Sequence, residues 1–200
     1  MSRTPARLVV LASGMGTNLQ ALIDACREPD FGARIAALFS DQEEAFALER
    51  ARRAGIPAFP VSRLKGEARQ GYDARLAELV AAEEPDLVLL LGWMRLLSSA
   101  FLSRFHGRIV NLHPALPGTF PGTHAIERAF EAFRKGRIDM TGVMLHFVPD
   151  EGVDSGPLVA EVDVPIYDDD DIDRLEARVH QAEHRLLLDT VRGLACKGFL

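Results

Sequence analysis

The feature that most constrains the fold is a short apolar run that ends in polar residues and then meets prolines and glycines. Residues 108–113 read RIVNLH, and residues 114–122 read PALPGTFPG. The first segment is typical of a buried strand and the second of a rigid loop. Pro114 disfavours helical dihedral angles at His113, so the strand is expected to stay extended to its end. Because residues two apart share a face of a strand, Asn111 and His113 are predicted to point the same way.

Apolar strands and helical segments alternate along the rest of the chain. This alternation predicts an α/β fold, a doubly wound, mostly parallel open sheet with helices on both faces. We expect residues 1–200 to form a single domain. Such sheets bind ligands at the carboxyl ends of their strands, which makes the end of the 108–113 run the predicted reaction centre. The expected strands are residues 7–12, 34–40, 56–61 (an edge strand), 87–91, 108–113, 140–148 and 158–166, and the expected helices are residues 19–26, 42–54, 66–84, 99–105, 123–134 and 170–195.

Composition excludes several classes of protein. The formal net charge of -6 argues against a general nucleic-acid binder, which needs a basic surface. The two cysteines, Cys26 and Cys196, have no spacing that suggests zinc, so no metal is expected. The amino terminus is polar and no apolar run approaches the ~18 residues of a membrane span. We therefore expect a cytoplasmic protein without nucleic-acid or membrane partners, and a homodimer is compatible with the sequence.

A glycine turn, residues 13–18 (SGMGTN), directly follows the first predicted strand and precedes a helix. This arrangement aims several free N–H groups at an anion. A tight turn in which Thr17 or Asn18 caps the helix would have the same pattern. A further alternative is the dinucleotide fingerprint of a Rossmann-type, nicotinamide-binding oxidoreductase. That fingerprint needs a small residue where Leu19 stands, although Asp41 could supply its acidic residue, and a thermal-shift titration with NAD would discriminate.

The strand end carries groups suited to acyl transfer. Asn111 offers neutral N–H donors, and His113 can be a base or a cation near neutral pH. A nearby carboxylate would raise the pKa of His113 and keep it charged. No Ser or Cys stands beside His113 as a nucleophile, so we predict direct transfer with the oxyanion stabilised by Asn111 and His113. The remaining histidines considered, which we expect to be merely hydrogen-bonded, are His106, His124, His146 and His184.

Four aspartates, residues 168–171, precede the last predicted helix. Such a run could bind a metal ion. Carboxylates are also favoured in the first turn of a helix, where the dipole is positive. We expect this run to cap the helix.

Four segments together resemble the 10-formyltetrahydrofolate transferase family, and within it the phosphoribosylglycinamide formyltransferases of purine biosynthesis. They are residues 13–20 (SGMGTNLQ), 92–97 (GWMRLL), 111–114 (NLHP) and 154–156 (DSG). The resemblance covers nearly the whole chain and implies a Rossmann-like enzyme. Its implied reaction moves the formyl group of the co-substrate 10-formyltetrahydrofolate to the amine of glycinamide ribonucleotide. Related transferases acting on methionyl-tRNA, and the deformylases, carry further domains for which 200 residues leave no room.

The resemblance also implies roles for individual residues. Asn111, His113 and Asp154 would be catalytic, with direct attack by the amine and a tetrahedral intermediate that they stabilise. Asp154 would hold His113 charged and relay the proton of the amine through water. The implied substrate-binding residues are Gly16, Thr17, Asn18 and Glu183 for the phosphate and ribose, and Arg69, Met94, Arg95, Leu96, Leu97, Asn111 and Val153 for the folate.

Two positions depart from the family pattern. His180 stands where a polar amide is expected. The loop of residues 146–154 is one residue longer than usual, with Pro149 as the insertion. Alignment backward from Asp154 makes that residue the catalytic acid, with Asp150 as the weaker candidate.

Overall fold

The computed structural model describes residues 4–197, with side chains through residue 195, and contains a seven-stranded sheet in the order β3-β2-β1-β4-β5-β6-β7. The first five strands are parallel, and β6 and β7 are antiparallel to their neighbours. The strand order reverses between β1 and β4, so the carboxyl ends of β1, β4 and β5 lie along one edge. The predicted doubly wound, mostly parallel fold is confirmed. The strands are β1 (Ala6–Leu11), β2 (Ala33–Ser40), β3 (Ala58–Pro60), β4 (Leu87–Leu90), β5 (Ile109–His113), β6 (Met140–Phe147) and β7 (Leu158–Pro165).

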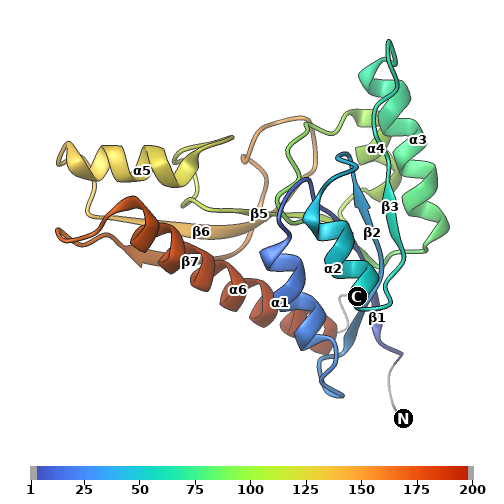
Figure 1. Cartoon of the computed structure of the whole chain (residues 1–200), viewed down its shortest axis with the longest axis horizontal. Helices are drawn as coiled ribbons and strands as arrows, with labels where there is room; N and C mark the ends of the chain where they lie inside the picture. The colour runs from blue at the N-terminus through green and yellow to red at the C-terminus, as the bar shows by residue number, and fades with distance from the viewer. Residues whose placement is uncertain (1–3, 198–200) are drawn as a thin grey trace.

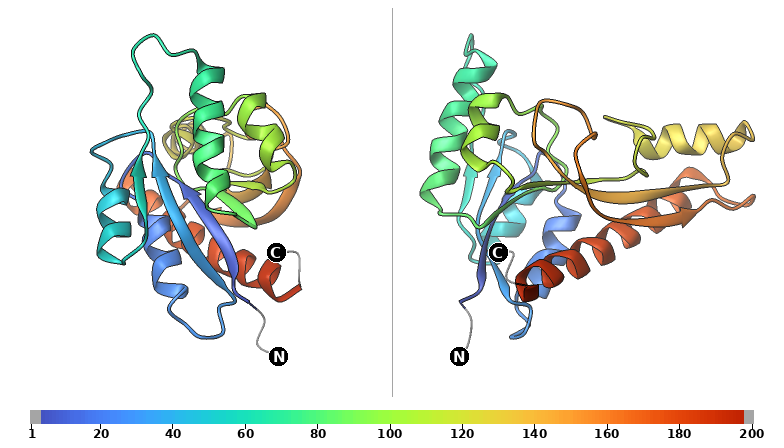
Figure 2. Two further views of the ribbon diagram at one scale, coloured as in Figure 1. Left: turned by 90° about the vertical axis from the view of Figure 1, so that its right-hand side faces the viewer. Right: turned by 180° about the vertical axis from the view of Figure 1, so that it is seen from behind.

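Helices cover both faces of the sheet, as alternate side chains of β1 show. Leu8 and Val10 pack in a core with α1, α2, α5 and α6, whereas Val9 and Leu11 pack in a second core with α3 and α4. Figure 2 shows the helices on either side of the twisted strands. The helices are α1 (Thr17–Ala25), α2 (Phe46–Arg53), α3 (Arg69–Ala82), α4 (Ser99–Leu102) followed by a 3-10 turn η1 (Ser103–Phe105), α5 (Ala125–Arg134) and α6 (Ile172–Lys197).

The long helix α6 joins the two ends of the molecule. It packs against β6 and β7 at one end and against α1 further along (Figure 1). This course brings the middle of α6 to the start of α1. No helix within residues 4–197 combines the length and the apolar character that a membrane span requires.

Helix boundaries differ from the predictions where tertiary contacts decide them. Helix α1 begins at Thr17 with Gly16 as its N-cap in the left-handed conformation, and no side chain caps it, so the alternative in which Thr17 or Asn18 caps this helix was wrong. Helix α6 begins at Ile172, two residues later than predicted, and the predicted capping by the aspartate run is confirmed at Asp171, whose Oδ1 accepts the N–H of Arg174 at 2.9 Å. Its neighbour Asp170 instead forms a buried ion pair.

Candidate active site

The structure brings together the three residues predicted to be catalytic. Asn111 and His113 project from the same face of β5, and Asp154 lies on the loop between β6 and β7. Asn111 Nδ2 donates to Asp154 Oδ1 at 3.0 Å. His113 Nδ1 lies 3.3 Å from the other carboxylate oxygen, Oδ2. The end of β5 therefore forms one hydrogen-bonded unit with a loop some forty residues further along the chain.

The position of Asp154 is fixed by its backbone and by its neighbours. Asp154 has a φ of 48°, a left-handed conformation that non-glycine residues seldom adopt. The N–H of Gly122 donates to Asp154 Oδ2 at 2.7 Å. Two residues later, a Cβ at Gly156 would collide with the carbonyl oxygen of Phe147, so only glycine fits there. Asp150, the weaker candidate, is exposed and accepts the N–H of Gly152 at 2.8 Å, away from the cluster.

A fourth member of the cluster, His146, was missed by sequence reasoning. It pairs across the sheet with Asn111 and is only 2% exposed. Its Nε2 lies 3.2 Å from Asn111 Nδ2 and 3.3 Å from Asp154 Oδ1, and its Nδ1 lies 2.9 Å from the carbonyl oxygen of Phe147. His146 is hydrogen-bonded, as expected, but its partners include Asp154, one of the residues predicted to be catalytic, which the sequence did not indicate. The available signal was a polar residue near the end of an apolar strand, the same signal that identified Asn111 and His113.

Burial decides the protonation of His113. It lowers the pKa of His113, and the raising effects of Asp154 and of the Phe120 carbonyl do not restore it. Asp154 thus raises the pKa of His113, as expected, but burial outweighs it, so the expectation that Asp154 keeps the ring charged is not supported. Burial alone would raise the pKa of Asp154, but hydrogen bonds from His146 and Gly122, together with the nearby His113, bring it below its ordinary value. The cluster thus holds an ionised carboxylate beside a His113 ring that favours its neutral form.

Both ring nitrogens of His113 face oxygen atoms. Nδ1 faces Asp154, and Nε2 lies 3.1 Å from the carbonyl oxygen of Phe120. Arg128 Nη2 also donates to the Phe120 carbonyl, at 2.7 Å, which fixes that loop. A ring with two acceptors can donate two hydrogen bonds when it gains a proton, so the geometry stabilises the imidazolium at the moment a proton arrives.

The start of α1 and the middle of α6 form a second polar site on the same edge of the sheet. The N–H of Gln20 makes the first helical bond, to the carbonyl of Gly16 at 2.9 Å, so the N–H groups of Thr17 and Asn18 precede the bonded ladder. Helix α1 has no acidic residue in its first turn. The structure thus places Gly16, Thr17 and Asn18 where an anion would meet the positive end of a helix.

Glu183 reaches this second site from α6. Asn18 Nδ2 donates to Glu183 Oε2 at 3.2 Å, which brings the predicted phosphate and ribose residues together. Burial raises the pKa of Glu183, despite the lowering effects of Asn18 and His180. His180, the departure from the family pattern, lies with its Nε2 4.0 Å from Glu183 Oε2 and is exposed.

The segment after β4 presents apolar side chains beside the cluster. Met94 is 66% exposed and Leu96 is 50% exposed, while Leu97 is buried in the core. The N–H of Met94 donates to Ser13 Oγ at 3.0 Å, which ties this segment to the glycine turn. Val153, next to Asp154, is 42% exposed. Exposed apolar side chains beside polar groups are typical of a ligand site.

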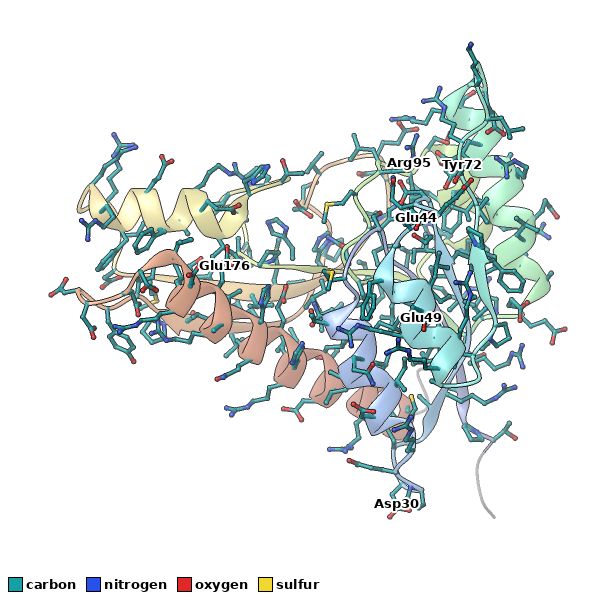
Figure 3. The ribbon with its side chains drawn as sticks, viewed as in Figure 1. Asp30, Glu44, Glu49, Tyr72, Arg95 and Glu176 are labelled. Atoms are coloured by element: carbon teal, nitrogen blue, oxygen red, sulfur yellow. The ribbon has the colours of Figure 1, made fainter. Side chains whose placement is uncertain are left out.

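The two predicted folate-binding arginines are engaged by acidic residues in this structure. Arg95 lies with its guanidinium 5.0 Å from the ring centre of Tyr72, beside which Figure 3 labels it, and 3.8 Å from Asp41 Oδ2. Arg69 forms an ion pair with Glu151, and the other oxygen of Glu151 accepts the N–H of Ser99 at 3.0 Å. Arg69 is thus linked to the loop that carries Asp154, through a residue three positions before Asp154.

The arrangement offers an amide, two imidazoles and a carboxylate, with an anion site and exposed apolar side chains nearby. Within residues 4–195, no group of three or more His, Cys, Asp and Glu side chains has the geometry of a metal site. The chemistry that these groups can supply is proton transfer and stabilisation of a developing negative charge.

Comparison with known proteins places the chain among relatives of one kind. The family model for formyl transferases matches residues 6–191. The chain is 44% identical to a phosphoribosylglycinamide formyltransferase of Mycobacterium tuberculosis, over 97% of this chain and 87% of the relative. It is 43% identical to the phosphoribosylglycinamide formyltransferase of Schizosaccharomyces pombe, over 93% of this chain and 95% of the relative. The crystal structure of glycinamide ribonucleotide transformylase 1 from Symbiobacterium toebii superposes with a TM-score of 0.90 at 39% identity, covering 98% of this chain and 90% of that one.

Proposed function

The chain belongs to the formyl transferase family, and we propose that it transfers the formyl group of 10-formyltetrahydrofolate to the amine of 5-phosphoribosylglycinamide, a step of purine biosynthesis. The observation that carries this proposal is the convergence of Asn111, His113 and Asp154 on the sheet edge that also holds the start of α1. The cluster of Asn111, His113 and Asp154 can thus contact the reacting amine while the start of α1 binds the phosphate of the same molecule. Family membership removes the alternative of a nicotinamide-binding oxidoreductase.

We assign the stabilisation of negative charge to Asn111. Its Nδ2 carries two hydrogens, of which one is donated to Asp154 Oδ1, while His146 Nε2, 3.2 Å from Nδ2, itself donates to Asp154. The second hydrogen can turn to a formyl oxygen that gains negative charge as the amine attacks. A buried, prealigned donor of this kind is worth more than one in water, because it needs no reorganisation during the reaction.

His113 and Asp154 handle the proton of the amine. The neutral His113 ring, favoured by burial, can accept a proton directly or through water. The resulting imidazolium has Asp154 on one side and the Phe120 carbonyl on the other. Asp154 therefore stabilises the charge on His113 when it forms, and need not keep the ring charged beforehand. The imidazolium can then give its proton to N10 of the folate, which leaves as the bond between N10 and the formyl carbon breaks.

The site fits a folate on physical grounds. An aromatic pterin needs apolar contacts, and Met94, Leu96 and Val153 are large apolar side chains exposed beside the polar cluster. Arg69 and Arg95 supply positive charge for the carboxylates of a glutamate tail. Bound 10-formyltetrahydrofolate supplies the formyl group, and Leu97 can form only the floor of the pocket because it is 4% exposed.

The acceptor would lie between the two sites. The N–H groups of Gly16, Thr17 and Asn18 would hold its phosphate, and Glu183 would accept hydrogen bonds from its ribose hydroxyls. We place this single-domain enzyme in the cytoplasm, acting as a monomer or a homodimer.

The decisive experiment is an assay of formyl transfer from 10-formyltetrahydrofolate to glycinamide ribonucleotide with the purified chain. We expect transfer by the wild-type chain and its near loss in His113→Ala. Thermal-shift titration should show stabilisation by glycinamide ribonucleotide and by a folate analogue, and none by NAD. A wild-type chain that forms no formylated product from these two substrates would refute the proposed function.

A further inference from the structure

Arg50 of α2 reaches across to the glycine turn that precedes α1. Its Nε donates to the carbonyl oxygen of Met15 at 2.8 Å, and its Nη1 donates to Gln20 Oε1 at 3.2 Å. Met15 directly precedes the Gly16 cap, and Gln20 lies one turn into α1. Arg50 therefore makes one hydrogen bond to the residue before the expected phosphate site and one to a residue after it. Figure 1 shows α1 and α2 beside each other, and Figure 3 labels the adjacent Glu49 on α2.

The glycine turn packs closely against α2 and is hydrogen-bonded to it. The N–H of Ala47 donates to the carbonyl of Gly14 at 3.0 Å. Gly16 has a φ of 69°, and a Cβ placed on it would lie 2.8 Å from Ala47 Cβ and 3.5 Å from Arg50 Cδ. The carbonyls of Gly14 and Met15 are thus both bound by α2. Carbonyl oxygens would repel an anion, so their capture by α2 favours the turn in which the following N–H groups are free to meet one.

Among the side chains described here, residues 4–195, no carboxylate forms an ion pair with Arg50. Its two hydrogen-bond partners are the uncharged oxygens of Met15 and Gln20, and no ion pair involves it among the side chains through residue 195. Arg53, on the same helix, provides the contrast, because its Nε donates to Glu49 Oε1 at 2.8 Å. Both guanidinium groups lie over the ring of Phe46, at 4.9 Å and 5.8 Å. The two arginines therefore share their packing and differ in whether they contact the turn.

We propose that Arg50 is a positioning residue for the acceptor's phosphate, holding the glycine turn in its anion-binding shape and leaving an uncompensated positive charge beside it. This inference rests on the proposed function, because it assumes that the phosphate binds at the start of α1. Bound phosphate would gain from both the orientation of the N–H groups and the nearby charge. The contribution belongs to binding and not to the chemical step.

The test compares two acceptors, glycinamide ribonucleotide and the same riboside without its phosphate, in wild type, Arg50→Met, Arg50→Lys and the matched control Arg53→Met. We expect Arg50→Met to raise KM for the ribonucleotide by about 10- to 100-fold, which corresponds to ~1.4–2.7 kcal/mol of binding free energy. Its kcat should change by less than about threefold, and KM for the riboside should not change. Arg50→Lys should recover part of the loss, and Arg53→Met should behave as wild type. An equal rise in KM for both acceptors, or no rise for either, would overturn the proposal.

Binding of ribose 5-phosphate, measured by calorimetry against ribose, separates this proposal from the proposed function. Tighter binding of ribose 5-phosphate by wild type, weakened in Arg50→Met, would support the role of Arg50 even if no formyl transfer were found. A wild-type chain that binds both sugars equally would overturn it whatever the activity. If Arg50→Met does not fold, as judged by circular dichroism, Arg50→Gln takes its place, because the amide keeps a donor for Met15 without the charge.

Discussion

His146 Nε2 lies 3.3 Å from Asp154 Oδ1, the carboxylate oxygen opposite the one that faces His113. The two imidazole rings therefore hold Asp154 between them. Replacing His146 with Gln should let Asp154 and Asn111 shift while β5 and β6 stay paired. We expect kcat to fall by roughly 10- to 100-fold with small changes in both KM values, because small misplacements of reacting groups are costly. Steady-state kinetics measure this, with the exposed His106→Gln as control. Wild-type kcat in His146→Gln would show that the ring contributes nothing to positioning.

Asn111 supplies the only amide N–H donors in the four-residue cluster Asn111, His113, His146 and Asp154. Asn111→Ala should lower kcat by about 10²–10³, as the loss of one oxyanion donor does, while the affinity for folate changes far less. Single-turnover rates, together with folate binding followed by fluorescence, separate the two effects. Near-normal turnover in a folded Asn111→Ala chain would contradict the role proposed for this side chain.

Asp154 opposes the effect of burial on His113. Burial lowers the pKa of His113, and the negative charge of Asp154 raises it part of the way back. In Asp154→Asn this opposition is lost, so the titration midpoint of His113 should move to still lower pH than in wild type. Proton–carbon NMR of the ring across the pH range measures the midpoint, with Asp150→Asn as the control that leaves the cluster intact. The same midpoint in wild type and Asp154→Asn would exclude electrostatic pairing between the two residues.

Local sequence patterns were sufficient to predict where β5 ends and which of its side chains share a face. The RIVNLH run and the prolines after it predicted that Asn111 and His113 share a face at the end of a strand, and the structure confirms this. Asp154 was reached only through resemblance to a family, because no local pattern relates it to β5. His146 escaped prediction because its role depends on the antiparallel register that sets it opposite Asn111, a long-range pairing.

Burial and helix contacts explain the other differences. The sequence indicated that a carboxylate near His113 would raise the pKa of His113. It did not show that this residue would be only 5% exposed, and this burial makes the net change in the pKa a lowering. The polar residues Thr17 and Asn18 are good caps by composition. Packing of the turn against Ala47 of α2 instead gives the N-cap position to Gly16, where a side chain would not fit.

Asp170 and Arg178 form a bidentate ion pair at the start of α6. Arg178 Nη1 and Nη2 each donate to one oxygen of Asp170 at 2.7 Å, and the carboxyl side chain is 2% exposed. Hydrogen bonds from Arg178 and from the N–H of Tyr167 lower the pKa of Asp170 to about 2 from its ordinary 3.8. Because the folded-state pKa is lowered, the stabilisation is complete well above pH 3.8 and is lost as the pH falls toward about 2.

Asp170→Asn should therefore reduce the free energy of unfolding by roughly 1–3 kcal/mol at neutral pH and by clearly less at about pH 3. Urea unfolding at the two pH values measures this, and Asp169→Asn is the control, since the Asp169 side chain is 83% exposed and its pair with Arg174 is expected to contribute under ~1 kcal/mol. An equal loss in Asp170→Asn at both pH values would mean that packing, and not the charge of Asp170, stabilises the start of α6.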